Sequence, residues 1–147
     1  MCGEKNMEGF ILKPIGILHT PYKNTWNTPR QGRFSEEICE IEVFKEYEKG
    51  LEGIEEYSYL IILYWLHKAE RNILLTYTPS GGKKRGVFAT RSPNRPNPIG
   101  LSVVKLVERK RNILRIVGID AIDGTPLLDI KPYFQELDNP QENNATL

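Results

Sequence analysis

The apolar runs of this chain are short, and this limits the folds that it can adopt. The longest run lies within YLIILYWL, from Tyr59 to Leu66. It is far shorter than the ~20 apolar residues that a membrane-spanning helix needs, so we expect no membrane association. The run is apolar at both odd and even positions and rich in aromatic and β-branched residues, as is typical of a strand covered on both faces. It therefore predicts a central β-strand.

Other segments add short strands with turn signals between them. ICEIEVF, 38–44, alternates apolar and acidic residues, which predicts a strand with one acidic face. Segments 100–108 and 112–120 are joined by the polar turn ERKRN and predict a hairpin. The dipeptide Asp123-Gly124 predicts a turn before a last strand that ends at Tyr133. The remaining expected elements are strands at 11–19, 72–78 and 86–91, a flexible basic loop at 79–86 and a short helix at 44–54.

This pattern indicates the fold class. Strands of this number and length are typical of a closed or nearly closed barrel. We expect a mainly β fold, a small antiparallel (or mixed) β-barrel with one or two short helices. A length of 147 residues fits a single domain. The domain is expected over 10–137, between a flexible N-terminal tail at 1–9 and a polar C-terminal tail at 138–147.

Composition and motifs exclude several classes of function. The two cysteines form no pattern and the N-terminus has no apolar signal segment, so we expect a reduced, cytoplasmic protein. No glycine-rich segment follows a strand and opens a helix, which argues against a dinucleotide or phosphate loop. Neither a nucleophile elbow nor a paired-carboxylate signature is present. The histidines and cysteines lack metal-site spacing, so no metal is expected.

The net charge of +1 hides an uneven distribution. The segment 36–56 carries nine Glu against Lys45 and Lys49, whereas 20–34 and 83–95 carry Lys and Arg but no acid. Two basic segments without acids predict one face that meets an anion. The alternative is an ordinary solvated surface.

The proline-rich stretch SPNRPNPIG, 92–100, is the most unusual local feature. Proline fixes its own φ and pushes the preceding residue into extended geometry, so three prolines predict an extended, preorganised rod over Ser92–Ile99. Such a rod would present Arg and Asn side chains at set angles, for a carboxylate, a phosphate or a base edge. A rigid crossover between two strands explains the prolines equally well, and both interpretations stay open.

The longer stretch GVFATRSPNRPNPIGLS, 86–102, is similar to the signature of the TsaA-like (TrmO) family of β-barrel S-adenosylmethionine-dependent methyltransferases. Further blocks resemble that family in the same order: IGILHTPYK (15–23), PRQG (29–32), LEGIEEYSYLIILYWLHK (51–68) and DGTPLLDIKPY (123–133). Characterised members methylate the exocyclic nitrogen of threonylcarbamoyl-adenosine beside the anticodon of tRNA. The resemblance implies this activity, S-adenosylmethionine as cofactor and a homodimer with its site near the two-fold interface.

The resemblance also implies the residues that bind the cofactor. They are Pro29, Arg30, Gln31, His67, Lys68, Arg91, Leu101, Asp123, Gly124, Thr125 and Pro126. The chemistry agrees, because this cofactor needs a cation for its carboxylate, an acceptor for its ammonium and an acid or aromatic ring for its sulfonium. Arg91 or Arg30 suits the first role, and Asp123, Tyr22 or Trp65 the others. The sequence leaves the assignment open.

Catalysis is expected to rest on alignment of the acceptor nitrogen with the methyl group. Asp123 and His67 are the candidates for a general base, although water can also serve. Each has an ordinary alternative: His67 as a structural histidine at the end of an apolar strand, and Asp123-Gly124 as a simple turn.

RNA contacts are expected from the basic loop and the proline stretch. The candidates are Lys83, Lys84, Arg85, Asn94, Arg95 and Asn97, with Tyr22 or Trp26 stacking on a splayed base. Bacterial family members often carry an additional C-terminal domain, whereas only a polar tail follows DIKPYF here, so we expect the RNA contacts of such a domain to be absent. The alternative functions are a non-catalytic RNA- or anion-binding barrel and a methyltransferase for a small-molecule acceptor.

Overall fold

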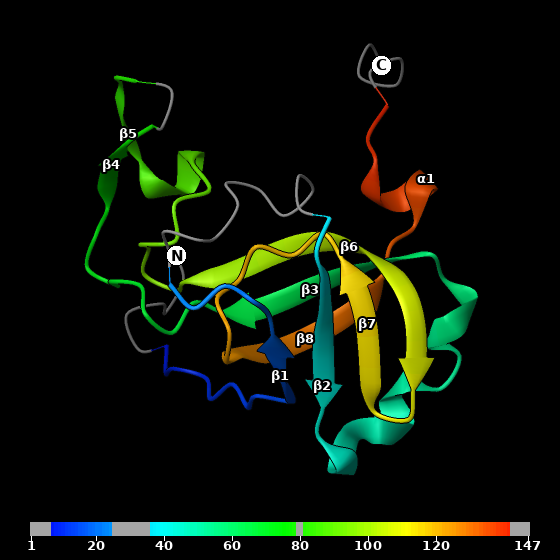
Figure 1. Cartoon of the computed structure of the whole chain (residues 1–147). Helices are drawn as coiled ribbons and strands as arrows, with labels where there is room; N and C mark the ends of the chain where they lie inside the picture. Colours follow the sequence, from blue (N-terminus) through cyan, green and yellow to red (C-terminus); the bar gives the residue numbers. More distant parts are fainter. Residues whose placement is uncertain (1–6, 25–35, 79–80, 142–147) are drawn as a thin grey trace.

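The computed structural model describes residues 7–24, 36–78 and 81–141. Six strands close into a barrel in the order β1-β2-β7-β6-β3-β8, and each is antiparallel to both of its neighbours (Figure 1). The barrel strands are β1 (Gly16–His19), β2 (Ile38–Val43), β3 (Tyr59–Trp65), β6 (Ile99–Lys110), β7 (Ile113–Val117) and β8 (Thr125–Pro132). The predicted mainly β, single-domain antiparallel barrel is confirmed.

The predicted central strand lies where the sequence indicates. β3 pairs with β6 on one side and with β8 on the other. Its side chains Leu60, Ile62 and Tyr64 point into the core, and each inward aliphatic side chain contributes about 1.5–3 kcal/mol by its burial. The outward residues Ile61, Leu63 and Trp65 of β3 are half-buried, and Tyr59 at its start is exposed.

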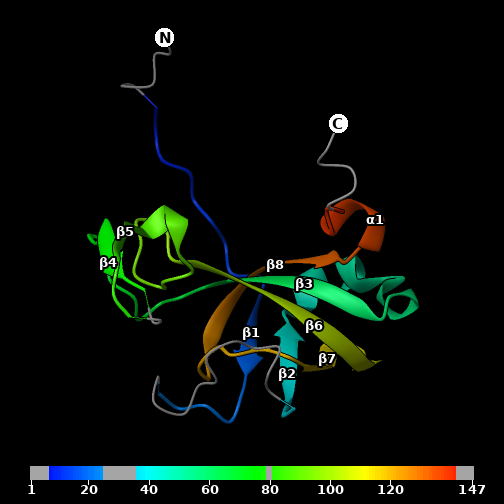
Figure 2. The same ribbon diagram turned by 90° about the horizontal axis from the view of Figure 1, so that it is seen from above.

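Two predicted local structures are wrong. The segment 86–91 is not a strand, because Val87–Ala89 forms a short 3₁₀ helix, η5, in which the Thr90 hydroxyl donates a hydrogen bond to the Val87 carbonyl. A hydroxyl that bonds to nearby backbone competes with strand pairing. The expected flexible loop at 79–86 instead contributes β5 (Lys84–Gly86), which pairs with β4 (Leu75–Tyr77). This two-stranded sheet stands beside the barrel (Figure 2).

The helical segments are shorter than expected. The helix predicted at 44–54 is divided into the 3₁₀ helices η3 (Lys45–Leu51) and η4 (Ile54–Glu56), because Gly53 lies between them at φ 86°. A further short helix, α1 (Gln135–Asp138), follows β8. No helix in the described ranges is long and apolar enough to cross a bilayer.

The alternating strand directions give the barrel two different rims. The first, which we call the site rim, contains the carboxyl ends of β1, β3 and β7 and the amino ends of β2, β6 and β8. The opposite rim carries η3, η4 and the Arg111–Asn112 turn of the β6–β7 hairpin. Segments far apart in sequence therefore meet at the site rim.

Candidate functional site

The site rim gathers most of the predicted cofactor residues. His67 and Lys68 follow the carboxyl end of β3 in an exposed turn, Leu101 lies in the first part of β6, and the segment 123–126 leads into β8. Arg91 follows η5 and precedes the proline stretch that leads into β6. Because β6 and β8 both pair with β3, these segments are neighbours at one end of the barrel. Pro29, Arg30 and Gln31 lie outside the described residues, as does Trp26.

Asp123 fixes the turn before β8 to the segment that follows β1. Its Oδ1 accepts a hydrogen bond from the Thr20 amide at 3.0 Å, and its Oδ2 pairs with Lys23 Nζ at 2.8 Å. The hydrogen bond from Lys23 is the main cause that lowers the pKa of the Asp123 carboxyl, and Thr20 acts in the same direction. Gly124, at φ 85°, supplies the left-handed backbone that the turn requires. Both carboxylate oxygens are therefore occupied within the fold.

A buried polar cluster that the sequence analysis did not identify lies beneath the rim. The Tyr64 side chain is only 3% exposed, and its hydroxyl lies 2.8 Å from Ser102 Oγ. The same hydroxyl donates a hydrogen bond to Asp120 Oδ1 at 2.9 Å. Burial raises the pKa of the Tyr64 phenol, and the negative charge of Asp120 raises it further, so the phenol stays neutral and acts as a donor.

Gly100, the last residue of the proline stretch, makes this cluster possible. It pairs with Tyr64 across β3 and β6. A Cβ at this position would lie 2.3 Å from Cε2 of the tyrosine ring, which is much closer than side chains pack. The glycine that the sequence analysis associated with close backbone approach therefore makes room for the Tyr64 ring.

The proline stretch itself is bent, so the expected extended rod over Ser92–Ile99 is wrong. Bends occur at Pro93 and at 95–97. The Arg95 guanidinium donates to the backbone carbonyls of Thr90 at 3.0 Å and Ser92 at 2.9 Å, which turns the chain back on itself. Each X-Pro unit restricts its own residues, but the side-chain hydrogen bonds decide the path between the units.

The asparagines of the stretch attach it to the turn after β3. Asn94 Oδ1 accepts a hydrogen bond from the Glu70 amide at 2.9 Å, and Asn97 Oδ1 accepts one from Arg71 at 3.1 Å. Arg71 also lies over the Trp65 ring, 5.1 Å from its centroid. These contacts agree with the rigid-crossover interpretation. The RNA-binding role of Asn94, Asn97 and Arg95 stays a prediction.

The basic residues Lys83, Lys84 and Arg85 are exposed on and beside β5, in the two-stranded sheet. No acidic residue lies in their segment from 81 to 91. Their position leaves them accessible to a polyanion, and RNA binding through them also stays a prediction. In the described part of the chain, no group of His, Cys, Asp or Glu side chains is arranged to hold a metal ion.

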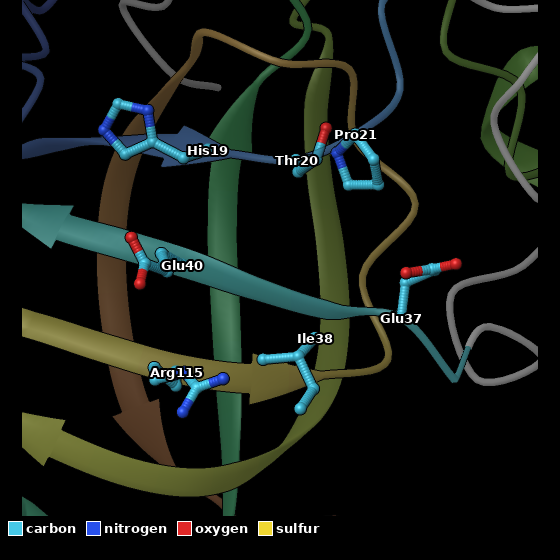
Figure 3. A pocket seen from close by; sticks show the side chains of 7 residues that line it. All are labelled: His19, Thr20, Pro21, Glu37, Ile38, Glu40 and Arg115. Atoms are coloured by element: carbon cyan, nitrogen blue, oxygen red, sulfur yellow. The ribbon is translucent and has the colours of Figure 1, made fainter.

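A shallow hollow lies on the outer surface near the ends of β1, β2 and β7. It measures about 350 Å³ and is lined by His19, Thr20, Pro21, Glu37, Ile38, Glu40 and Arg115 (Figure 3). His19 pairs with Glu42 at 2.8 Å and Arg115 with Glu108 at 2.8 Å, so charged partners cover this surface. Of the predicted cofactor residues that the structure describes, none lines the hollow.

Comparison with known proteins identifies the family to which this chain belongs. A model of the tRNA-methyltransferase O N-terminal domain matches residues 17–139. A probable S-adenosyl-L-methionine-binding protein of Archaeoglobus fulgidus is 52% identical over 128 residues, which are 87% of this chain and 35% of the relative. One of Methanothermobacter thermautotrophicus is 48% identical over 128 residues, with 87% of this chain and 93% of the relative covered.

More distant relatives carry names that state an activity. A tRNA (adenine(37)-N6)-methyltransferase of Mus musculus is 40% identical over 139 residues, which are 89% of this chain and 32% of that protein. The crystal structure of TrmO from P. aeruginosa superposes with a TM-score of 0.77 at 33% identity, covering 93% of this chain and 60% of the other. The chain thus spans about a third of some relatives and nearly the whole of others. From the matched domain and the shared barrel, we conclude that this chain belongs to the tRNA-methyltransferase O N-terminal domain family.

Proposed function

We propose that this protein is an S-adenosylmethionine-dependent methyltransferase that methylates N6 of an adenosine beside the anticodon of tRNA, with threonylcarbamoyl-adenosine as the acceptor. The observation that carries this proposal is the meeting of the family-matched segments after β3, before β6 and before β8 at the site rim. The names of relatives that bind S-adenosylmethionine or methylate adenine 37 of tRNA support it. A reduced, cytoplasmic location agrees with such a substrate.

The donor set at the rim fits the cofactor. Arg91 is exposed, and its guanidinium makes no hydrogen bond or ion pair within the described ranges, so it is available to a carboxylate. Leu101 is 47% exposed and offers an apolar surface to the adenosyl group. His67, Lys68 and the turn 123–126 would complete the binding surface. When bound, the cofactor supplies an electrophilic methyl group.

The contribution of the protein to the reaction is chiefly to orient the two substrates. The hydrogen bonds of Asp123 to Thr20 and Lys23 hold two rim segments in a fixed relation, which reduces the cost of ordering the site. The acyl group on the acceptor nitrogen makes its N–H more acidic, so a weak base is sufficient. Because Asp123 already binds two donors, His67 is the better-placed candidate for that base, and it is exposed at the rim.

Binding of the anticodon loop is assigned to the exposed cations of the two-stranded sheet. Lys83, Lys84 and Arg85 would release counterions from the RNA phosphates, which makes the interaction salt-dependent. Asn94, Arg95 and Asn97 would act from the proline stretch, whose anchoring contacts give it a defined shape.

We further propose that the working unit is a homodimer with its site near the interface. The outer faces of β3 and β6 pair Ile61 with Val103 and Leu63 with Leu101, and residues 101 and 103 are 47% and 40% exposed. An outward apolar sheet face of this kind is typical of a protein–protein contact. The two-stranded sheet β4–β5 would also gain stability from contact with a second protomer, because isolated two-stranded sheets are marginal in water.

The central experiment incubates the protein with bulk tRNA and labelled S-adenosylmethionine and then identifies the modified nucleoside. A methylated threonylcarbamoyl-adenosine is the expected product. Cofactor binding is measured separately by isothermal titration. Binding of the cofactor without methylation of tRNA would favour a small-molecule acceptor, whereas no cofactor binding by folded protein would favour a non-catalytic RNA- or anion-binding barrel. Sedimentation at micromolar protein tests the dimer.

A further inference from the structure

The backbone on both sides of Arg91 is held by one neighbouring side chain. The Arg95 guanidinium donates from Nη1 to the carbonyl of Thr90 at 3.0 Å and to that of Ser92 at 2.9 Å. These two residues directly precede and follow Arg91 in the chain. We call this pair of hydrogen bonds the Arg95 clasp. It restrains the backbone from which the Arg91 side chain projects.

A second set of hydrogen bonds closes the same segment. The Ser92 amide donates to Thr90 Oγ1 at 3.1 Å, and this hydroxyl donates to the Val87 carbonyl at 2.9 Å. The peptide group before Arg91 is thus held through its carbonyl by the Arg95 clasp, and the peptide group after Arg91 is held through its amide by Thr90. Because peptide groups are planar, fixing both of them fixes the two backbone dihedrals of Arg91.

Arg95 itself lies on an anchored part of the proline stretch. It precedes Pro96, and this disfavours helical backbone at Arg95. The Pro96 carbonyl accepts a hydrogen bond from Arg71 Nε at 2.7 Å. The Pro98 carbonyl accepts one at 2.8 Å from the amide of Leu66, the residue directly after β3. The clasp therefore connects the segment that carries Arg91 to a support held by the barrel.

The two arginines have different surroundings. Arg95 is half-buried and donates within the fold, whereas Arg91 is exposed and makes no hydrogen bond or ion pair in the part of the chain that the structure describes. A side chain that binds a ligand loses conformational freedom, and a backbone fixed beforehand reduces this cost. The pair is therefore suited to a division in which one arginine binds an anion and the other holds it in position.

We propose that Arg95 is a positioning residue for the carboxylate of the cofactor and that it acts through Arg91, without touching the cofactor. The inference rests on the proposed function, because it names the support of a contact that this function requires. The clasp uses Nη1 of Arg95. The RNA contact proposed for the same residue would use its other donors, Nε and Nη2.

The test compares S-adenosylhomocysteine with 5′-methylthioadenosine in isothermal titration. Both ligands carry a thioether on the same adenosyl group, and only the first has the amino-acid head with its carboxylate. Arg95→Met removes the donors of the clasp and keeps an unbranched apolar side chain. It is expected to weaken binding of S-adenosylhomocysteine by about three- to tenfold, the size of one net hydrogen bond, and to leave binding of 5′-methylthioadenosine unchanged.

Two further variants separate positioning from direct contact and from general damage. Arg91→Ala alone is expected to weaken binding of S-adenosylhomocysteine by about tenfold or more, and Arg95→Met should add no further loss in that background. Arg109→Met is the matched control, because Arg109 also donates to two backbone carbonyls, those of Leu51 and Arg111, but at the opposite rim. It is expected to bind both ligands like the wild type. Comparing ligands within one variant cancels any loss of folded protein.

The contrary outcomes are distinct. Unchanged affinity for S-adenosylhomocysteine in Arg95→Met overturns the inference, and so does an equal loss for both ligands, which would indicate damage to the site. An equal loss with and without Arg91 would show that Arg95 contacts the carboxylate itself, and full affinity in Arg91→Ala would leave no contact to position, so each of these results also overturns it. If the folded wild type binds neither ligand, the proposed cofactor is wrong and the inference fails with it.

Discussion

Gly100 is the position at which one added methyl group should have the largest effect on this barrel. The Cβ of Gly100→Ala would lie 2.3, 2.7 and 2.8 Å from three ring atoms of Tyr64. The Tyr64 ring cannot simply rotate away, because it lies in the core and its hydroxyl forms hydrogen bonds with Ser102 and Asp120. Overpacking of a core costs about 1–3 kcal/mol, and each hydrogen bond lost when the ring moves adds about 1 kcal/mol.

We therefore expect Gly100→Ala to lower the free energy of unfolding by about 2–5 kcal/mol, measured by urea denaturation with tryptophan fluorescence. Gly50→Ala is the matched control, because its Cβ meets no atom within 4 Å and its φ lies outside the left-handed region. It should change stability by less than about 1 kcal/mol.

A double-mutant cycle tests the cause. In a Tyr64→Ala background the ring is absent, so the additional cost of Gly100→Ala should fall to that of the control. An equal cost of Gly100→Ala in both backgrounds would show that the ring contact is not responsible, and a wild-type stability for the single variant would refute the packing argument altogether.

Substitutions at three other places test the site and the turn that supports it. Arg91→Ala should weaken the affinity for the cofactor by about 1.5–3 kcal/mol, measured by isothermal titration. Arg91→Lys should restore only part of this affinity, because an ammonium cannot replace the two parallel hydrogen bonds of a planar guanidinium. Full affinity of Arg91→Ala would show that this residue does not contact the cofactor. Neutralising Lys83, Lys84 and Arg85 together should reduce the slope of the logarithm of RNA affinity against the logarithm of salt concentration, and it should leave the affinity for the cofactor unchanged. An unaltered slope would show that these residues do not bind RNA phosphates. The lowered pKa of Asp123 adds stability above its ordinary value of 3.8, and this stability is lost as the pH falls through the folded-state value. Asp123→Asn should therefore be less stable than the wild type at pH 7 and equally stable well below that range, and a constant difference across pH would contradict the linkage.

Parts of the fold that depend on local pattern could be predicted from the sequence. β3 was found from its continuous apolar run, the β6–β7 hairpin from its polar turn, and the start of β8 from Asp123-Gly124, since each signal lies within a few residues. The bent path of the proline stretch could not be predicted, because it depends on where the Arg95 guanidinium finds carbonyl acceptors. The same holds for η5, which Thr90 stabilises through its own side chain.

The polar cluster was missed for a different reason. Its members are separated by 38 and 56 positions in the sequence, so only strand register brings them together. A weak signal does exist: Tyr64 and Ser102 carry hydroxyls at inward positions of strands that are otherwise apolar inside. Buried polar atoms require partners, so each such position indicates a partner elsewhere in the chain.

The separation of the two rims has a practical consequence for surface-based measurements. The β6–β7 turn at Arg111 lies at the end of the barrel away from the site rim, and Arg109 fastens this end by donating hydrogen bonds to the carbonyls of Leu51 and Arg111. A dye or a biotin attached at position 111 would therefore leave the opposite opening of the barrel directed toward solution. Immobilised in this way, the protein would present the proposed cofactor and RNA contacts to a flowing ligand with a uniform orientation.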